Sequence, residues 1–357
     1  MNTYTILGMM SGTSLDGLDL VLAELQAKQG RWTFRILRSS CIGYEPEMRK
    51  KLLAAIGMSA PELLAFHKEY GRWLGKQAAE FLGGQSRVDA IASHGHTIHH
   101  RPEQGFTFQL GCPQELALHS GVRTIGDFRS LDISLGGQGA PLVPVGDRLF
   151  FGAYDFCLNL GGISNVSFER DGKRIAFDIG IANMLLNHLS GLEGLEYDKD
   201  GNLAAQGTVN AGLLQALDGL PYYGQPFPKS TGYEWFRDEI LPLLAANPDS
   251  VANQLRTAVA HISGQIARQL RSLSADGKGS VLVTGGGALN AFLMVQLEQD
   301  CGPGLELVVP DAKLIAFKEA LVFALLGALR LQGRVNVLAS VTGASRDSCS
   351  GVVIEPL

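Results

Sequence analysis

The sequence lacks the two glycine motifs by which most nucleotide-binding proteins are recognised. It contains no GxxxxGK[ST] stretch, which argues against a P-loop kinase, and no GxGxxG fingerprint of a dinucleotide-binding domain. It also contains no CxxC pair. Its five cysteines are odd in number and far apart, which disfavours a disulfide framework and a zinc site and indicates a reducing compartment.

Strong charge of one sign and long hydrophobic runs are missing as well. The net charge of −5 gives no electrostatic reason to expect a nucleic-acid partner. No basic run precedes the short apolar stretch at the N-terminus, so no signal peptide is predicted. The most apolar later segment, residues 320–329, is shorter than the roughly 20 residues that span a bilayer. We therefore expect a cytoplasmic protein that does not enter a membrane.

Glycine, in contrast, is abundant, and three glycine clusters follow apolar strands. Residues 11–17 lie between a strand over residues 3–9 and an alternating run over 18–25, which predicts a β-hairpin with a polar tip. Residues 161–165 follow a second strand in the same way. The third cluster, residues 285–288, leads from a strand over 280–284 into a helix. Three such turns in one chain indicate a nucleotide held between two similar halves.

The first turn has the composition of a phosphate-binding loop. Gly12 and Gly17 allow backbone N–H groups to approach a phosphate, and three hydroxyls add donors. The alternative is an ordinary hairpin turn in which these residues serve only the conformation. The hydroxyl residues are Ser11, Thr13 and Ser14.

The other candidate ligand groups of the nucleotide lie in all three turns. Asp16 is the candidate Mg²⁺ ligand, directly or through water, because Mg²⁺ prefers oxygen and keeps several waters. Gly161, Gly162 and Asn165 repeat the ingredients of the first turn. In the third turn a glycine run stands at a helix start, which suits an adenosine or phosphate edge. These glycines are Gly285, Gly286 and Gly287.

Asp178 is the best candidate for the base that a kinase needs. It follows an apolar strand and precedes a helix predicted to start near Ala182, and the alternative role there is an N-cap. Asp127 and Asp132 are further candidates, and Arg129 between them suits a substrate carboxylate. The alternative for these three is an ion pair within a loop.

Two polar segments are candidates for the substrate side of the site. The histidines of residues 94–100 have no zinc-type partner spacing, and His94 and His96 would supply only two ligands from one strand face. A polar loop facing the substrate is the preferred interpretation. The glycine-rich loop 136–141, which contains Gln138, is of the kind that lines a ligand cleft.

The periodicity predicts a mixed α/β fold whose ligands bind at strand ends. Additional strands are expected near 90–93 and 107–109. We expect a first domain over residues 1–126 plus about 338–357 and a second over 127–337, with no linker between them. Helices are predicted over residues 46–57, 60–82, 113–120, 182–189, 209–217, 232–244, 251–273, 289–299 and 317–331.

Seven segments in the same order resemble the anhydro-N-acetylmuramic acid kinase family, whose members have the sugar kinase/Hsp70/actin (ribonuclease H-like) fold. They cover nearly the whole chain, and together they are far more specific than any single turn. The segments are GMMSGTSLDGLD (8–19), HGHTIHHRP (94–102), DFRSLDISLGGQGAPLVP (127–144), NLGGISNVS (159–167), KSTGYEWF (229–236), TGGGALNAFLM (284–294) and VTGA (341–344).

The resemblance implies an ATP- and Mg²⁺-dependent enzyme of cell-wall recycling with ATP in an interdomain cleft. Water opens the ring of 1,6-anhydro-N-acetylmuramic acid, and the freed 6-oxygen receives the γ-phosphoryl group. By this resemblance Asp178 activates the water, and Arg129, Gln138, Asn183 and Glu319 lie on the sugar side. The ATP-binding stretch comprises Gly12, Thr13, Ser14, Leu15, Asp16, Gly17, Leu18 and Asp19.

The chain departs from the family pattern next to Asp178. The family reads Asp-Thr-Gly-Pro-Gly-Asn, whereas residues 178–183 read DIGIAN, and Lys318 precedes Glu319. These changes leave three alternatives open: a related kinase acting on another amino sugar, a catalytically impaired paralogue that binds sugar, and a nucleotide-dependent binding module. A homodimer is also compatible with the resemblance.

Overall fold

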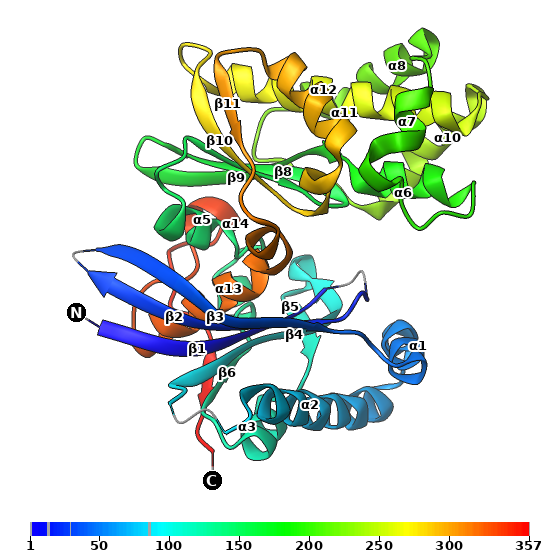
Figure 1. Cartoon of the computed structure of the whole chain (residues 1–357). Helices are drawn as coiled ribbons and strands as arrows, with labels where there is room; N and C mark the ends of the chain where they lie inside the picture. Colours follow the sequence, from blue (N-terminus) through cyan, green and yellow to red (C-terminus); the bar gives the residue numbers. More distant parts are fainter. Residues whose placement is uncertain (1, 13–14, 29, 85–86, 357) are drawn as a thin grey trace. The chain divides into compact units, whose positions relative to one another are not determined.

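The computed structural model describes residues 2–12, 15–28, 30–84 and 87–356 (Figure 1). The chain forms two compact units. The first unit contains the residues up to Phe150 and those from Phe317 onward, and the second runs from Phe151 to Ala316. Each unit is built on one β-sheet of mixed strand direction.

These units divide the chain at other points than the sequence predicts. Residues 127–150 and 317–337, expected in the second domain, belong to the first unit. The Thr342 hydroxyl donates to the buried Asp132 carboxylate at 2.7 Å, and Lys318 forms an ion pair with Asp147 at 2.7 Å. The boundary is set by such contacts between distant segments. The local composition near residues 150 and 316 does not mark it, so the sequence alone does not reveal it.

The first unit has a seven-stranded sheet in the order β12-β6-β4-β1-β2-β3, with β5 paired to β4. Strands β1, β2 and β3 form an antiparallel meander, and β4 and β6 continue the sheet parallel to β1. The strands are β1 (Asn2–Ser11), β2 (Leu18–Lys28), β3 (Arg31–Ile42), β4 (Ala90–Arg101), β5 (Phe106–Leu110), β6 (Thr124–Gly126) and β12 (Val352–Ile354).

The second unit repeats this topology in a five-stranded sheet of order β11-β10-β7-β8-β9. Strands β7, β8 and β9 form the meander, and β10 and β11 run parallel to β7. The expected similarity of the two halves and the ribonuclease H-like architecture are thereby confirmed. The strands are β7 (Phe156–Leu160), β8 (Ile163–Arg170), β9 (Lys173–Ile181), β10 (Gly279–Thr284) and β11 (Leu305–Val308).

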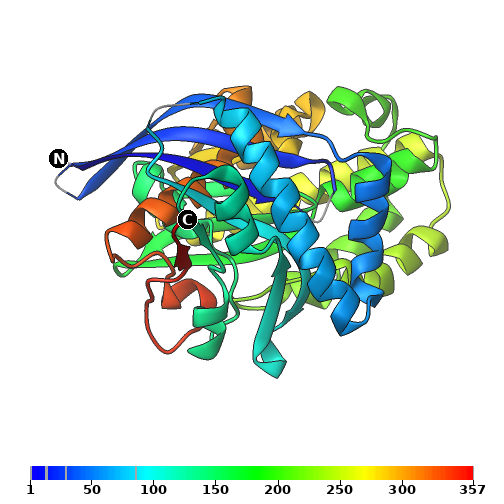
Figure 2. The same ribbon diagram turned by 90° about the horizontal axis from the view of Figure 1, so that it is seen from below.

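Helices cover both faces of the first sheet. Alternate residues of β1 face opposite sides of the sheet. Leu7 and Met9 pack in one core with Leu74 of α2, whereas Gly8 lies against the backbone of Ala320 in α13. Figure 2 shows α2 lying along its face of this sheet. The helical segments are α1 (Pro46–Ala54), η1 (Ala55–Gly57), α2 (Ala60–Leu82), η2 (Pro102–Gln104), α3 (Pro113–Ser120), α4 (Ser130–Ser134), α5 (Pro144–Phe150), α13 (Ala312–Leu331) and α14 (Ala339–Thr342).

In the second unit the long helix α11 packs against α6, α7, α8 and α12 and contacts β9. The apolar side chains of α11 join one core with those of the sheet, including Leu158, Val166 and Val281. The helical segments are α6 (Asn183–Gly191), η3 (Lys199–Gly201), α7 (Asn202–Gln206), α8 (Ala211–Asp218), η4 (Pro221–Gly224), α9 (Tyr233–Trp235), η5 (Phe236–Ile240), α10 (Leu241–Ala246), α11 (Val251–Leu273), η6 (Gly286–Leu289) and α12 (Ala291–Cys301).

The expected helices over 60–82, 113–120 and 251–273 are confirmed residue for residue. Strand β3 (Arg31–Ile42) was not expected, because half of its positions are exposed and most of these are Arg or Thr, so its identity depends on pairing with β2. Helix α13 begins at Ala312, five residues before the expected start. Within the described residues, no helix combines the length and hydropathy needed to cross a bilayer.

Candidate functional site

The first turn joins β1 to β2, where Ser11 pairs with Leu18. Thr13 and Ser14 lie outside the described residues. The side chains of Leu15 and Leu18 are 8% and 1% exposed and belong to the hydrophobic core of the first unit. Their buried side chains anchor the turn to the core. Only the backbone of these two residues therefore remains available to a ligand.

The Ser11 hydroxyl is part of an internal network, which corrects its expected role as a phosphate donor. It lies 2.6 Å from the Tyr44 hydroxyl and 2.8 Å from Nδ1 of His96. Tyr44 in turn lies 2.8 Å from the Tyr70 hydroxyl. Ser11 is almost fully buried, and its partners are distant in sequence, so no local pattern could have revealed them.

Two carboxylates flank the turn. Asp16 is exposed, and Asp19 is half-buried. Burial raises the pKa of Asp19, a hydrogen bond from Cys41 opposes that shift, and the charge of Asp16 adds to it. Gly17 serves the close approach of β3, because a Cβ there would lie 2.8 Å from the Cys41 Sγ. Among the described residues no group of three or more His, Cys, Asp or Glu is arranged as a metal site.

Arg129 is held by His94 of β4 in the first unit. Its Nε and Nη2 lie 3.1 and 2.9 Å from Nε2 of His94, and its Nη1 donates to the Gly139 carbonyl at 2.6 Å. Nδ1 of His94 lies 2.9 Å from the Gly95 carbonyl and must donate to it, so Nε2 is the acceptor. Burial and the Arg129 charge hold the pKa of His94 well below its ordinary value, consistent with this neutral tautomer.

Burial lowers the pKa of Arg129 to about 10, although Glu319 and Asp132 oppose the shift. The guanidinium therefore stays charged at neutral pH. The three hydrogen bonds to His94 and Gly139 use three of its five N–H groups and leave one on each terminal nitrogen. That remaining pair matches the two oxygens of a carboxylate. Glu319 is exposed and within electrostatic range of Arg129.

The loop 136–141 is fixed by Asp132 and Thr342. The Asp132 carboxylate accepts from the Gly139 amide at 2.8 Å, and the Gln138 amide donates to the Thr342 carbonyl at 2.8 Å. The Gln138 side chain is exposed. Because Asp132 is fully buried and bonded in this way, it supports the loop and is not a catalytic base. The carboxylate of Asp127 accepts from the Ser130 amide at 3.1 Å, which gives it a turn-forming role.

A cavity of about 340 Å³ opens within the first unit beside His94. Its lining is divided about evenly between polar and apolar surface. His96, in contrast, is turned into the Ser11 network, so the histidine segment divides between a cavity wall and the interior. The cavity is lined by His67, Ser93, His94, Gly95, Thr107, Phe108, Gln109, Leu110, Gly111, Pro113, Gln114, Gly126, Asp127, Ser130 and Val352.

In the second unit Asp178 lies on β9 directly opposite Asn165 of β8, at a register shift. Asn165 is in turn opposite Asn159 of β7. Directly opposed residues point to the same face of a sheet, so the three polar side chains form a row beside the second glycine turn. The N-cap alternative for Asp178 is wrong: α6 begins at Asn183, and Ala182 occupies its N-cap.

The segment 222–231 holds Asp178 at three points. The Asp178 amide donates to the Lys229 carbonyl at 3.0 Å, and the Tyr222 hydroxyl donates to the Asp178 carbonyl at 2.8 Å. Oδ2 of the carboxylate accepts from the Thr231 amide at 3.0 Å. Burial raises the pKa of Asp178, and the Thr231 bond opposes this. Sequence reasoning missed these partners, although the KSTGYEWF motif marked part of the segment.

The glycines of the second and third turns are of two kinds: some are needed for chain packing or internal hydrogen bonds, and others leave their α-carbon uncrowded. The carbonyls of Gly161 and Gly162 accept from the first amides of α6, so those amides are not free for a phosphate. Gly285 and Gly287 pack on Leu160, where a Cβ would be crowded. Of the glycines in these two turns, only Gly162 and Gly286 are uncrowded, because an added Cβ would meet its nearest atoms at 3.8 Å, an ordinary van der Waals distance. The glycine runs thus serve chain packing as well as any ligand.

Asn183 connects these turns to a cavity of about 160 Å³ in the second unit. Its side-chain amide donates to the Leu160 carbonyl at 2.9 Å, so part of its hydrogen-bonding capacity is used internally. The cavity is bordered by the residues that follow the third turn. It is lined by Asn183, Leu186, Asn187, Tyr197, Asp198, Lys199, Asp200, Val259, Leu289 and Asn290.

Known proteins resemble the chain over nearly its whole length. The family model described as "Anhydro-N-acetylmuramic acid kinase" matches residues 4–356. The anhydro-N-acetylmuramic acid kinase of Shewanella sediminis is 36% identical, covering 98% of each chain, and that of Gloeobacter violaceus is 36% identical, covering 97% of each. Among solved structures, component A of the Acidaminococcus fermentans (R)-2-hydroxyglutaryl-CoA dehydratase is 13% identical, with coverage of 90% and 96% and a TM-score of 0.44. The chain belongs to the anhydro-N-acetylmuramic acid kinase family, a family of phosphotransferases.

Proposed function

We propose that this enzyme uses ATP and water to convert 1,6-anhydro-N-acetylmuramic acid to N-acetylmuramic acid 6-phosphate, as a cytoplasmic step of cell-wall recycling. The observation that carries the proposal is the setting of Asp178 in a chain of this family. Its carboxylate is partly buried at the end of a polar row, and its backbone is held on both sides. This arrangement provides a base with a fixed orientation and a raised pKa.

In the proposed reaction Asp178 accepts a proton from the water that attacks the anomeric carbon. The bond between that carbon and O6 breaks, and O6 forms a bond to the γ-phosphorus of ATP as ADP leaves. The water oxygen remains on the anomeric carbon as a hydroxyl that keeps the second proton, and the proton taken by Asp178 is released to solvent. A partly buried carboxylate suits this role because its raised pKa makes it a stronger base than an exposed one.

We assign the nucleotide to the glycine turns. Gly162 and Gly286 are uncrowded at their α-carbons, where even an added Cβ would meet its nearest atoms at 3.8 Å, and this permits close approach of a phosphate or ribose. The cavity beside Asn183 and Leu289 follows the third turn and suits the nucleoside. Asp16 and Asp19 fit a Mg²⁺ ion that arrives with the phosphates, because Mg²⁺ accepts carboxylate oxygens and retains waters. Such an ion would neutralise phosphate charge.

We assign the acid group of the sugar to Arg129. N-acetylmuramic acid carries a carboxylate, and Arg129 retains one N–H on each terminal nitrogen for it. Arg129→Lys is expected to raise KM for the anhydro-sugar about 10- to 100-fold, as expected for a charged hydrogen bond of about 1.5–3 kcal/mol. Steady-state kinetics with 1,6-anhydro-N-acetylglucosamine, which lacks the carboxylate, provide the control. An equal loss on both sugars would contradict this assignment.

The hydrolytic step is tested by running the reaction in ¹⁸O-labelled water. We expect one ¹⁸O atom at the anomeric carbon of the 6-phosphate product at early times, detected by mass spectrometry. Unlabelled product incubated equally long in the same water corrects for spontaneous exchange of that oxygen. Unlabelled phosphorylated product would instead favour a kinase that acts on an intact sugar hydroxyl.

The changed residues Ile179, Ile181 and Ala182 favour a second candidate, a sugar-binding paralogue with impaired catalysis. A phosphorylation screen of anhydro-sugars against ordinary amino sugars separates the two. The proposed function requires turnover of the anhydro-sugar acid. Binding of that sugar by calorimetry without turnover of any sugar would establish the paralogue.

A further inference from the structure

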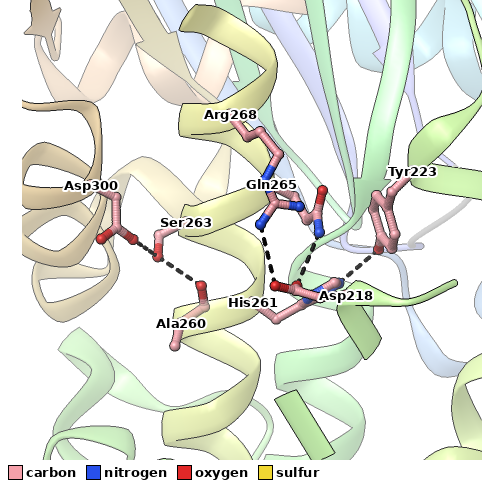
Figure 3. Close-up of polar contacts among 8 residues, drawn as sticks. All are labelled: Asp218, Tyr223, Ala260, His261, Ser263, Gln265, Arg268 and Asp300. Atoms are coloured by element: carbon pink, nitrogen blue, oxygen red, sulfur yellow. Dashed lines mark hydrogen bonds and ion pairs between the residues drawn. The ribbon is translucent and has the colours of Figure 1, made fainter. Parts of the chain in front are cut away.

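A polar cluster around the buried His261 in the second unit has no assigned part in the reaction described above. His261 of α11 is 1% exposed, and its ring lies between Asp218 and Tyr223 (Figure 3). Nδ1 is 2.6 Å from Oδ1 of Asp218, at the end of α8, and Nε2 is 2.8 Å from the Tyr223 hydroxyl. A carboxylate–imidazole–phenol chain whose central ring is buried and bonded at both nitrogens fixes the positions of its members more strictly than apolar packing does.

The Asp218 end of this cluster is a stable charged acceptor. Gln265 and Arg268 of α11 also donate to its carboxylate, at 3.0 and 3.3 Å. Burial alone would raise the pKa of Asp218, but the hydrogen bonds from His261 and Gln265, with the Arg268 bond, lower it to about 2. Asp218 is therefore ionised at neutral pH and directs the Nδ1 proton of His261 toward itself, which leaves Nε2 to engage Tyr223.

The Tyr223 end touches the strand that carries Asp178. The tyrosine ring lies on the backbone of Gly180, where an added Cβ would be 2.6 Å from its Cε1. Nζ of Lys229 donates to the Tyr222 carbonyl at 3.1 Å and lies 3.5 Å from that of Tyr223. Tyr223 thus contacts β9 and is tied by Lys229 into the segment 222–231. That segment holds the amide, carbonyl and carboxylate of Asp178.

We infer that Asp218, His261 and Tyr223 are positioning residues for Asp178. They anchor the segment 222–231 to α8 and α11, and that segment orients the carboxylate. The inference rests on the proposed role of Asp178 as the base. It assigns a function in the reaction to a cluster about 40 to 80 residues away from Asp178 in the chain.

Tyr223→Phe is the test with least disturbance, because it keeps the ring on Gly180 and removes only the hydroxyl. We expect kcat to fall about 10- to 100-fold, comparable with a misplacement of a reacting group by about 1 Å, with KM for ATP unchanged. His261→Ala should lose at least as much, and His261→Gln should recover part of the loss, because an amide can donate to Asp218 and accept from Tyr223.

Ser263→Ala is the matched control on the same helix. Ser263 is fully buried and donates to Asp300 at 2.5 Å and to the Ala260 carbonyl at 3.2 Å, away from Tyr223 (Figure 3). It should lower the unfolding midpoint as the Tyr223 variant does and leave kcat unchanged. Hydrogen exchange followed by mass spectrometry should become faster over residues 222–231 in Tyr223→Phe only.

Wild-type kcat and exchange in Tyr223→Phe and His261→Ala would overturn the inference. The same kcat loss in Ser263→Ala would also overturn it, because the effect would then reflect general destabilisation. Failure of the proposed function is distinguishable: in that case Asp178→Asn itself keeps turnover. Normal Tyr223→Phe turnover alongside an inactive Asp178→Asn contradicts only the positioning role.

Discussion

Asp178→Asn is expected to lower kcat about 10²- to 10⁴-fold, the usual contribution of a positioned general base. The amide keeps the size of the side chain and can still accept from the Thr231 amide, but it cannot take a proton. Binding of ATP, measured by calorimetry, is expected to remain as in the wild type. Lost turnover with retained nucleotide binding would support the assigned role, and normal turnover would refute it.

Asp171→Asn is the matched control for this substitution. Asp171 lies in the turn between β8 and β9, is exposed and has φ 52°, a conformation that Asn also adopts readily. It makes the same chemical change on the same hairpin without touching the polar row. We expect wild-type kinetics from it, so a loss shared by both variants would point to damage to the hairpin.

The pH dependence of kcat should report the same carboxylate. Burial raises the pKa of Asp178, and the base is active only when deprotonated. Activity is therefore expected to be present above that pKa and to fall as pH falls through it, at a higher pH than for an ordinary carboxyl group. The acid limb should be absent from the residual activity of Asp178→Asn. An unchanged acid limb in that variant would assign it to another group.

Lys318→Met is expected to lower the free energy of unfolding by about 3–5 kcal/mol, the usual cost of breaking a buried ion pair. Nζ of Lys318 lies 2.7 Å from Asp147 Oδ1, and both side chains are 6% exposed. The pair joins α13 to α5 within the first unit. Removing the cation leaves the Asp147 charge buried without it, and urea unfolding followed by fluorescence measures the loss.

The double variant Lys318→Met/Asp147→Leu should be more stable than Lys318→Met alone, because removal of both charges also removes the desolvation cost. Lys313→Met, an exposed lysine in α13, is the control and should leave the unfolding midpoint unchanged. If the double variant were as unstable as the sum of the two single variants, the pair would have no coupling energy. The buried cation would then act through packing alone.

Local sequence determined most helices of this protein. For α2 (Ala60–Leu82), Ser59 and Glu62 form a capping box at one end, and Gly83 ends the helix in the left-handed conformation. These signals operate within a few residues, so they are legible without the fold. The strand–turn pattern likewise predicts the hairpins at residues 12–17 and 161–165, because alternation and turn residues are adjacent in the chain.

The candidate residues Asp178 and Arg129 were also identified from sequence, but their surroundings were not. The Thr231 amide that binds Asp178 is 53 positions away, and His94, which holds Arg129, is 35 positions away. Equally, Ser11 has the residue type of a phosphate donor and yet bonds to His96, 85 positions away. The residue type limits the chemistry that a side chain can perform. The fold decides which hydrogen-bond partner that side chain meets.

The sequence by itself determined where helices and turns begin, which groups can titrate or donate, and the family to which their order belongs. Only the tertiary structure decided that Asp132 supports a loop and that Asp218, His261 and Tyr223 form one hydrogen-bonded chain. The physical reason is range: caps and turns are governed by hydrogen bonds between near neighbours, whereas burial and long-range pairing exist only after the sheets and helices have packed.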